Sequence, residues 1–285
     1  MLTRIVAFID GSAYAQSVCD HAAWAAIRLG GPVEVVHVLG RRDVASAPAD
    51  LSGNLDANTQ ETLLSELAAL DAQKARLALK RGRLILDEAK QRLQSAGVAD
   101  VTTRLRHGDL IDTVVELEHE ARFLCLGKRG EGADFARLHL GSNLERVARA
   151  SSRPILVAAR AFKPIERFLI AFDGGASSLK AVDHVAASPV LRGLACHLLM
   201  VGPDSADAER RLVAATSRLE AGGLSVRAEI LPGEPDKVIA RTVEQERIGL
   251  LVMGAYGHSR IRSLVIGSTT TAMIRSCLVP IFMFR

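Results

Sequence analysis

Residues 4–12 read RIVAFIDGS and residues 168–175 read FLIAFDGG, so one short pattern occurs twice in this chain of 285 residues. In each copy a run of apolar residues ends in an aspartate, Asp10 or Asp173, and small residues follow it. An apolar run of this length that ends in a polar turn is typical of a strand buried in a parallel sheet. We therefore expect the chain to begin the same kind of domain twice.

Further landmarks recur in the same order in both halves of the sequence. They are a second apolar run (residues 33–40 and 196–202), a glycine turn (Gly108 and Gly233), an apolar run that ends in glycine (Gly127 and Gly254) and a final run opened by proline (Pro154 and Pro280). Short apolar runs that alternate with helical patterns indicate a sheet covered by helices on both faces. The expected fold is α/β, with two tandem doubly wound, Rossmann-like domains of about five parallel strands each.

A short linker divides the two halves. Residues 161–164 read AFKP, and the proline interrupts regular structure just before the second copy begins. We expect one domain over residues 1–160 and a second over residues 165–285, which agrees with the usual size of a domain.

Composition narrows the class of protein. No run approaches the roughly 18 apolar residues of a membrane span, and the first residues do not resemble a signal sequence, so a cytoplasmic protein without membrane contact is expected. The four cysteines are scattered, which favours reduced thiols in the core. A net charge of +4 would suit an anionic partner, but aromatic residues make up only 4% and no dense basic run accompanies them. Nucleic acid is therefore not an expected partner.

The second half contains a glycine pattern suited to phosphate. After the strand that ends at Met253 come Gly254-Ala255-Tyr256-Gly257, nine further residues, and then Gly267-Ser268-Thr269 at the start of a helix. Glycines let the backbone approach a ligand closely, and free N–H groups at a helix start favour an anion. Taken alone, such a pattern also fits a tight turn between a strand and a helix.

These residues resemble the universal stress protein family, whose nucleotide-binding members carry G-x2-G-x9-G-[S/T] at this place in the domain. Gly254, Gly257, Gly267 and Ser268 match that pattern without a gap. The resemblance extends over nearly the whole chain in two copies. It implies a protein of the stress response that binds ATP, together with Mg²⁺, and that regulates a protein partner not identified by the sequence.

The resemblance also implies roles for single residues of the second half. Asp173 is expected near the ribose or the metal, and Val201 beside the base. Met253 and Gly254 are expected to flank the nucleotide, and the phosphates are expected at Gly257, Gly267, Ser268 and Thr269. For Asp173 a second interpretation stays open, because aspartate before glycine often forms a turn or caps a helix.

The first half departs from the family pattern. Gly127-Lys128-Arg129-Gly130 is present, but ten residues separate Gly130 from Gly141, and the loop contains the carboxylates of Glu131 and Asp134. Carboxylates repel phosphate, although the basic residues Lys128, Arg129 and Arg137 offset them. We expect a weaker nucleotide site here, formed by Asp10, Val38, Gly127, Gly130, Gly141 and Ser142.

The first half also contains an insertion with a long helical pattern, from about Gln60 to Ala96. Leucine recurs every seven residues in it, at Leu63, Leu70, Leu77 and Leu84, and Gly82 is a candidate break. Such a stripe is expected to pack on the sheet or on the neighbouring domain rather than to bind a partner, because a single seven-residue repeat is weak evidence for a coiled coil.

Three functions remain open at this point. The sequence lacks a P-loop, a nucleophile elbow, a kinase signature and a zinc-binding histidine pattern, so no catalytic residues and no protein-bound metal are expected, and any enzyme activity would be slow ATP hydrolysis. The leading interpretation is an ATP-binding regulator, and the alternative is an interaction or small-ligand scaffold that binds no nucleotide.

The resemblance implies that the last strands, residues 154–158 and 280–284, pair antiparallel, so that one chain mimics the family's dimer. A homodimer of two chains is compatible with the sequence but not determined by it.

Overall fold

The computed structural model describes residues 4–40, 57–130, 142–255 and 268–285. The first half contains β1 (Arg4–Ile9), α1 (Ala15–Leu29), β2 (Val33–Leu39), α3 (Ala57–Ser95), β3 (Val101–His107), α4 (Leu110–Leu117), η1 (Glu118–Glu120), β4 (Ala121–Gly127), α5 (Ser142–Ala150) and β5 (Ile155–Ala158). The second half contains β6 (Arg167–Phe172), α6 (Ala176–Ala187), η3 (Pro189–Leu191), β7 (Ala195–Val201), α7 (Ala206–Ala221), β8 (Val226–Leu231), α8 (Pro235–Gln245), β9 (Leu250–Gly254), α9 (Ser268–Ser276) and β10 (Ile281–Phe284).

The described strands form one ten-stranded sheet in the order β3-β2-β1-β4-β5-β10-β9-β6-β7-β8. Within each half all neighbouring strands are parallel, and the order 3-2-1-4-5 of the first half recurs in the second. The two halves meet where β5 and β10 pair antiparallel, with Leu156 opposite Phe282. The expected fold of two tandem doubly wound units that form a pseudo-dimer is confirmed, and the expected linker lies between β5 and β6.

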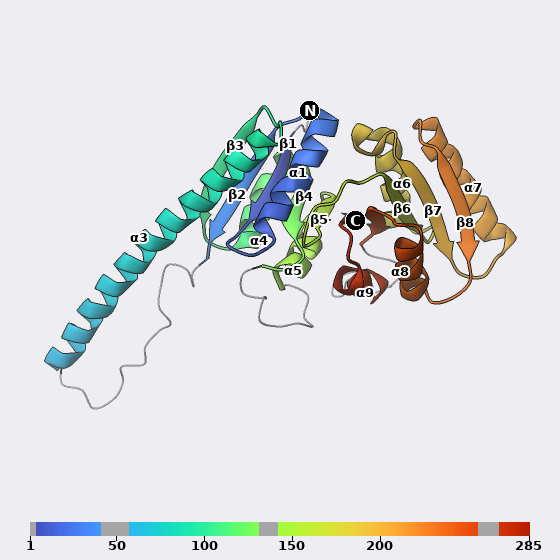
Figure 1. The fold of residues 1–285 in the computed structure, drawn as a ribbon. Helices are drawn as coiled ribbons and strands as arrows, with labels where there is room; N and C mark the ends of the chain where they lie inside the picture. The colour runs from blue at the N-terminus through green and yellow to red at the C-terminus, as the bar shows by residue number, and fades with distance from the viewer. Residues whose placement is uncertain (1–3, 41–56, 131–141, 256–267) are drawn as a thin grey trace.

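Helices cover both faces of the sheet (Figure 1). Side chains of α1, α3, α6 and α7 pack on one face, and those of α4, α5, α8 and α9 pack on the other. Each of the two resulting apolar clusters contains residues from both halves of the chain. The halves therefore share their core rather than folding around two separate ones.

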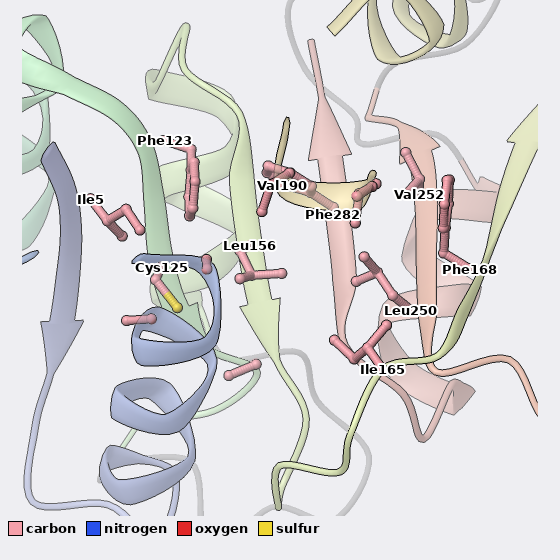
Figure 2. Close-up of a cluster of buried hydrophobic side chains, with 14 of the residues drawn as sticks. Ile5, Phe123, Cys125, Leu156, Ile165, Phe168, Val190, Leu250, Val252 and Phe282 are labelled. Atoms are coloured by element: carbon pink, nitrogen blue, oxygen red, sulfur yellow. The ribbon is translucent and has the colours of Figure 1, made fainter. Parts of the chain in front are cut away.

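Aromatic rings fill the junction between the halves. Phe123 of β4 meets Phe282 of β10 edge to face at 5.2 Å, and Leu156 lies between their strands (Figure 2). Phe282 in turn contacts Phe284 at 4.7 Å and His184 of α6 at 6.0 Å. Burial of this apolar surface stabilises the antiparallel pairing and protects two strand edges that each half alone would expose.

Local turn chemistry repeats between the halves as the sequence predicts. Gly108 follows β3 with φ of 123° and Gly233 follows β8 with φ of 131°, and both angles lie in a region that other residues rarely adopt. A helix begins two residues later in each half, at Leu110 and at Pro235. Asp109 caps the first of these helices by accepting a hydrogen bond from Ile111 N–H at 2.7 Å.

The long helix α3 departs from expectation in two ways. Leu70, Leu77 and Leu84 are 57–61% exposed, so the expectation that the leucine stripe packs on the sheet or the neighbouring domain is wrong. The residues that pack are Gly82, Leu86, Ala89 and Leu93, all in the last part of the helix. Figure 1 shows the earlier part projecting away from the sheet.

Gly82 does not interrupt α3. A β-carbon at this position would lie 2.9 Å from Leu105 Cδ1 and 3.0 Å from His37 Cδ2. The glycine therefore lets the helix lie close to β2 and β3. Its role is close packing, and the helical hydrogen bonds continue through it.

Candidate functional site

Each half has a point where the order of the strands reverses. In the first half β1 and β4 are neighbours, and the chain leaves them towards opposite edges of the sheet. Asp10 follows β1 and Gly127 ends β4, so both lie at the carboxyl ends of these strands. Asp173 after β6 and Gly254 at the end of β9 take the same places in the second half. Open parallel sheets bind ligands at such switch points, because the loops diverge there and leave a crevice.

A cavity of about 1340 Å³ occupies this place in the first half. Asp10, Val38, Gly127 and Gly130 all line it, so four of the six residues expected to form the weaker site are brought together. Sequence reasoning missed a further wall, which α3 provides through Lys74, Leu77 and Arg81. No local pattern signals that wall, because it depends on how α3 crosses the sheet.

Tight contacts explain the glycines of this cavity. A β-carbon on Gly127 would lie 2.7 Å from Tyr14 Cβ, and one on Gly130 would lie 2.8 Å from Asp10 Oδ2. The other oxygen of Asp10 accepts a hydrogen bond from Ser12 N–H at 3.0 Å. The carboxylate thus closes the turn after β1 and also contacts the loop after β4.

Charged groups surround the cavity. Arg146 of α5 donates to both carboxylate oxygens of Asp109, at 3.0 and 3.2 Å. Partial burial alone would raise the pKa of Asp109, but the hydrogen bond from Ile111 N–H and the Arg146 guanidinium hold the pKa below its ordinary value. Lys74, Arg81 and Arg129 add positive charge to the lining. The cavity therefore favours an anionic ligand.

Lys128 lines the cavity and also reaches the second half of the chain. Its side chain is buried, and its ammonium group donates hydrogen bonds to Cys277 O and, at 3.1 Å, to Val279 O in the second half. Burial lowers the pKa of Lys128. Glu131 and Asp134 lie outside the described residues, so the expectation that this lysine offsets their charge stays a prediction. The ammonium group itself joins the two halves.

In the second half Asp173 closes the turn that leads into α6, whose N-cap is Gly175. Its Oδ1 accepts hydrogen bonds from Gly175 N–H at 2.8 Å and from Ser178 Oγ at 2.6 Å. Gly174 between them has φ of 71°, which glycine adopts at no steric cost. The turn interpretation of Asp173 is thus present in the structure, whereas a side-chain cap of α6 is not. It does not exclude a ligand, because the same carboxylate lies at the switch point.

The end of β9 is closely packed. A β-carbon on Gly254 would lie 2.7 Å from Ser177 Oγ, and Thr270 Oγ1 of α9 donates to Gly254 O at 3.2 Å. This bond holds the first turn of α9 beside the end of β9. Since α9 begins at Ser268, its free N–H groups lie at the carboxyl edge of the sheet, where an anion is favoured.

The remaining expected residues are placed as follows. Val201 ends β7 and is half-buried, Met253 is buried in the core, and Thr269 is half-buried in the first turn of α9. Gly141, Gly257 and Gly267 lie outside the described residues, and Ser142 and Ser268 are described only as the first residues of α5 and α9.

One group of potential metal ligands occurs among the described residues, at some distance along the strand from Val201. His197 is buried, and its Nε2 lies 2.9 Å from Glu229 while its Nδ1 lies 3.4 Å from Glu246. Glu229 and Glu246 face different nitrogens of the ring. Arg227 forms an ion pair with each carboxylate, at 3.0 Å to Glu229 and at 2.7 Å to Glu246. Both carboxylates are therefore already paired with a guanidinium. We assign this group a structural role.

The same place in the first half supports this assignment. Glu34 of β2 lies there, 4% exposed at its side chain, with Arg4 at 3.1 Å and Arg104 at 2.7 Å. In the first half two arginines thus surround a buried glutamate. In the second half two glutamates and an arginine surround a buried histidine. Both arrangements surround a buried polar side chain on the second strand of the unit with charged side chains.

Comparisons with known proteins agree on the family. The model of the universal stress protein family matches residues 1–159 and 202–285. The chain is 39% identical over 287 residues to the universal stress protein Slr1230 of Synechocystis sp. (strain ATCC 27184 / PCC 6803 / Kazusa), with 100% of both chains covered. It is 23% identical over 300 residues to a universal stress protein of Mycolicibacterium smegmatis (strain ATCC 700084 / mc(2)155), covering 99% of this chain and 96% of the relative.

The fold also matches a solved structure. A universal stress protein from Archaeoglobus fulgidus DSM 4304 superposes with a TM-score of 0.73 at 19% identity, covering 100% of this chain and 99% of the other. No helix among the described residues has the length and apolar character needed to cross a bilayer.

Proposed function

The chain belongs to the universal stress protein family, and on that premise we propose that it is a regulator in the stress response that binds ATP, chiefly in its second half. The observation that carries the proposal is the second switch point. There Asp173, Gly254 and the start of α9 come together, and the chain pattern G-x2-G-x9-G-S lies between the last two.

The placement of α9 supports a phosphate-binding role. Because Thr270 Oγ1 donates to Gly254 O, the fold itself holds the first turn of α9 beside the end of β9. Prior ordering lowers the entropic cost of binding. We propose the phosphates at Gly257, Gly267, Ser268 and Thr269, with Val201 beside the base and the backbone of Met253 and Gly254 along the nucleotide.

We propose that Mg²⁺ accompanies the nucleotide. The oxygen donors at the site fit such an ion, since Mg²⁺ prefers carboxylate and phosphate oxygens. Asp173 would supply a carboxylate, and the bound ion would neutralise part of the phosphate charge. We also propose a cytoplasmic location, and a boundary between residues 160 and 165 for the two domains.

Equilibrium titration with ATP, ADP and AMP tests the proposal. The folded protein should bind ATP, and either Gly257→Val or Gly267→Val should weaken that binding by at least about tenfold, which equals about 1.4 kcal/mol. Gly130→Val serves as the matched variant in the first half and should leave the second site intact. Absence of binding by all three nucleotides to folded protein would refute the proposal.

The first-half cavity is a second candidate nucleotide site. Its positive lining and its position at the switch point favour an anion, although the ammonium group of Lys128 is hydrogen-bonded to carbonyl groups of the second half. Binding of one ATP per chain would assign the nucleotide to the second half alone. Binding of two, with one lost in Gly130→Val, would assign a site to each half.

The alternative function is an interaction scaffold that binds no nucleotide. The exposed leucines of α3 favour it, since large exposed apolar groups in a row are typical of contact surfaces. A scaffold would keep its signalling activity in Gly257→Val and Gly267→Val, whereas an ATP-dependent regulator would lose it.

A further inference from the structure

Most of the projecting part of α3 lies outside the candidate nucleotide sites, although Lys74, Leu77 and Arg81 also line the first-half cavity. No described residue between 61 and 81 is buried, although this stretch forms more than half of a helix of 39 residues. Helices in water owe most of their stability to packing of an apolar face. A helix that leaves the body of its own subunit therefore needs an apolar contact elsewhere.

The stretch has an apolar face for such a contact. Leu70, Leu77 and Leu84 are 57%, 60% and 61% exposed, and Leu63, one heptad earlier, is half-buried. A spacing of seven residues places these side chains within a narrow angle along one side of the helix, about 10.5 Å apart. They form a continuous row, here called the leucine row.

Charge is segregated along the same helix. Residues 57–73 contain three acidic residues and no basic one, and residues 74–86 contain five basic residues and no acidic one. The acidic residues are Glu61, Glu66 and Asp71, and the basic residues are Lys74, Arg76, Lys80, Arg81 and Arg83. This distribution discriminates between the possible occupants of the leucine row.

We propose that the leucine row binds the α3 helix of a second copy of this chain, in antiparallel orientation. Leu70 then lies opposite Leu77 of the second copy, and Leu63 opposite Leu84, so that all four leucines are paired. The acidic part of each helix lies beside the basic part of the other. Parallel pairing would instead place like charges together, which is unfavourable.

The proposal commits to a homodimer for a physical reason. In a two-fold symmetric dimer the same surface of each copy meets itself. One end of that surface must therefore be complementary to its other end. α3 meets this condition, because its own acidic and basic parts and its own leucines complete one another about an axis near Gln73. The pairing is separate from the β5–β10 junction, which is already made within one chain.

Analytical ultracentrifugation of the full-length protein tests the proposal. The unaltered chain should dimerise with rising concentration, and the double variant Leu70→Ser with Leu77→Ser should raise the dissociation constant by at least about tenfold because it removes two of the four paired leucines. Val213→Ser is the matched control, since Val213 is 64% exposed on α7, away from the row. A chain that stays monomeric, or a dimer that survives the double variant, overturns the proposal.

Charge reversal gives a second, independent test. Glu66→Lys should weaken the dimer, and adding Lys80→Glu should restore it, because the two positions face each other across the antiparallel pair. Failure of the second substitution to restore association would overturn the orientation. Circular dichroism of each variant confirms that α3 remains helical.

Cross-linking measures the orientation directly. All four native cysteines are buried, so a new exposed thiol reports on α3 alone. Gln73→Cys, near the proposed axis, should form a disulfide-linked dimer under mild oxidation. Glu66→Cys should not, because the two thiols would lie roughly 22 Å apart in the antiparallel pair. Cross-linking of both variants would indicate parallel pairing and overturn the proposal.

Discussion

The ammonium group of Lys128 donates a hydrogen bond to Val279 O at 3.1 Å, so that a residue of the first glycine loop is anchored in the second half of the chain. Val279 lies between α9 and β10, and Cys277 O beside it accepts from the same lysine. The glycine loop of one half is thereby tied to the end of the helix that begins at the proposed nucleotide site of the other.

Replacing Lys128 should loosen this junction. Lys128→Met keeps the apolar stem but leaves two carbonyl groups without the donor, and an unpaired buried polar group costs about 1–3 kcal/mol. Urea unfolding monitored by circular dichroism should show that loss. Lys180→Met, an exposed lysine on α6, is the control and should change the free energy of unfolding by less than about 0.5 kcal/mol. Equal effects of both variants would contradict the anchoring role.

Two substitutions at Asp173 separate its role in the turn before α6 from a ligand role. Asp173→Ala removes the acceptor for Gly175 N–H and Ser178 Oγ and should destabilise the protein by about 1 kcal/mol, as loss of a hydrogen-bond acceptor does. Asp173→Asn keeps an acceptor and most of the stability but removes the negative charge. If Asp173 helps to hold Mg²⁺, the asparagine variant should lose the Mg²⁺-dependent part of ATP affinity while keeping its stability. Identical affinities with and without the asparagine substitution would limit Asp173 to its role in the turn.

His184 should make stability sensitive to acid. Burial, with a smaller contribution from Arg122, lowers its pKa from 6.5 to about 4. The unfolded chain therefore takes up the proton first as the pH falls. The stabilising contribution is complete above pH 6.5 and is lost progressively towards pH 4, by at most about 3 kcal/mol.

His184→Phe checks this pH dependence. Phenylalanine keeps an aromatic ring beside Phe282 and Phe284 and has no proton to take up. Urea unfolding at pH 7.5 and pH 5 should show a smaller loss of stability for the variant than for the unaltered protein. Parallel pH profiles would show that other groups control the acid response.

Removing one partner of Glu34 should be more costly than breaking an exposed ion pair. Arg104→Met leaves a carboxylate that is 4% exposed with Arg4 as its remaining close guanidinium, and we expect a loss of about 1–3 kcal/mol. Arg210→Met is the matched control, because Arg210 pairs with Asp207 while 76% exposed. Its loss should stay below about 1 kcal/mol. Thermal unfolding of the two variants side by side gives the comparison.

Patterns within short windows predicted much of the fold. The apolar runs that end at Asp10 and Asp173 form the first strands of the two units. The glycine turns at Gly108 and Gly233 have similar positive φ angles, 123° and 131°. Such features depend on the few residues around them. The roles of Gly257, Gly267 and the other nucleotide residues remain predictions, since their evidence is the chain pattern.

The sequence by itself determined the twofold repetition, the alternation of strands and helices, and the resemblance that names the family, because periodicity and turn residues act locally. Only the tertiary structure decided that Lys128 reaches Val279, that α3 walls the first cavity, and that the leucine row faces outward. These outcomes depend on contacts between residues far apart in the chain. Leucines spaced by seven residues give the same sequence pattern whether they pack on the protein's own sheet or on another molecule. Only the exposure of these side chains in the folded structure distinguishes the two cases.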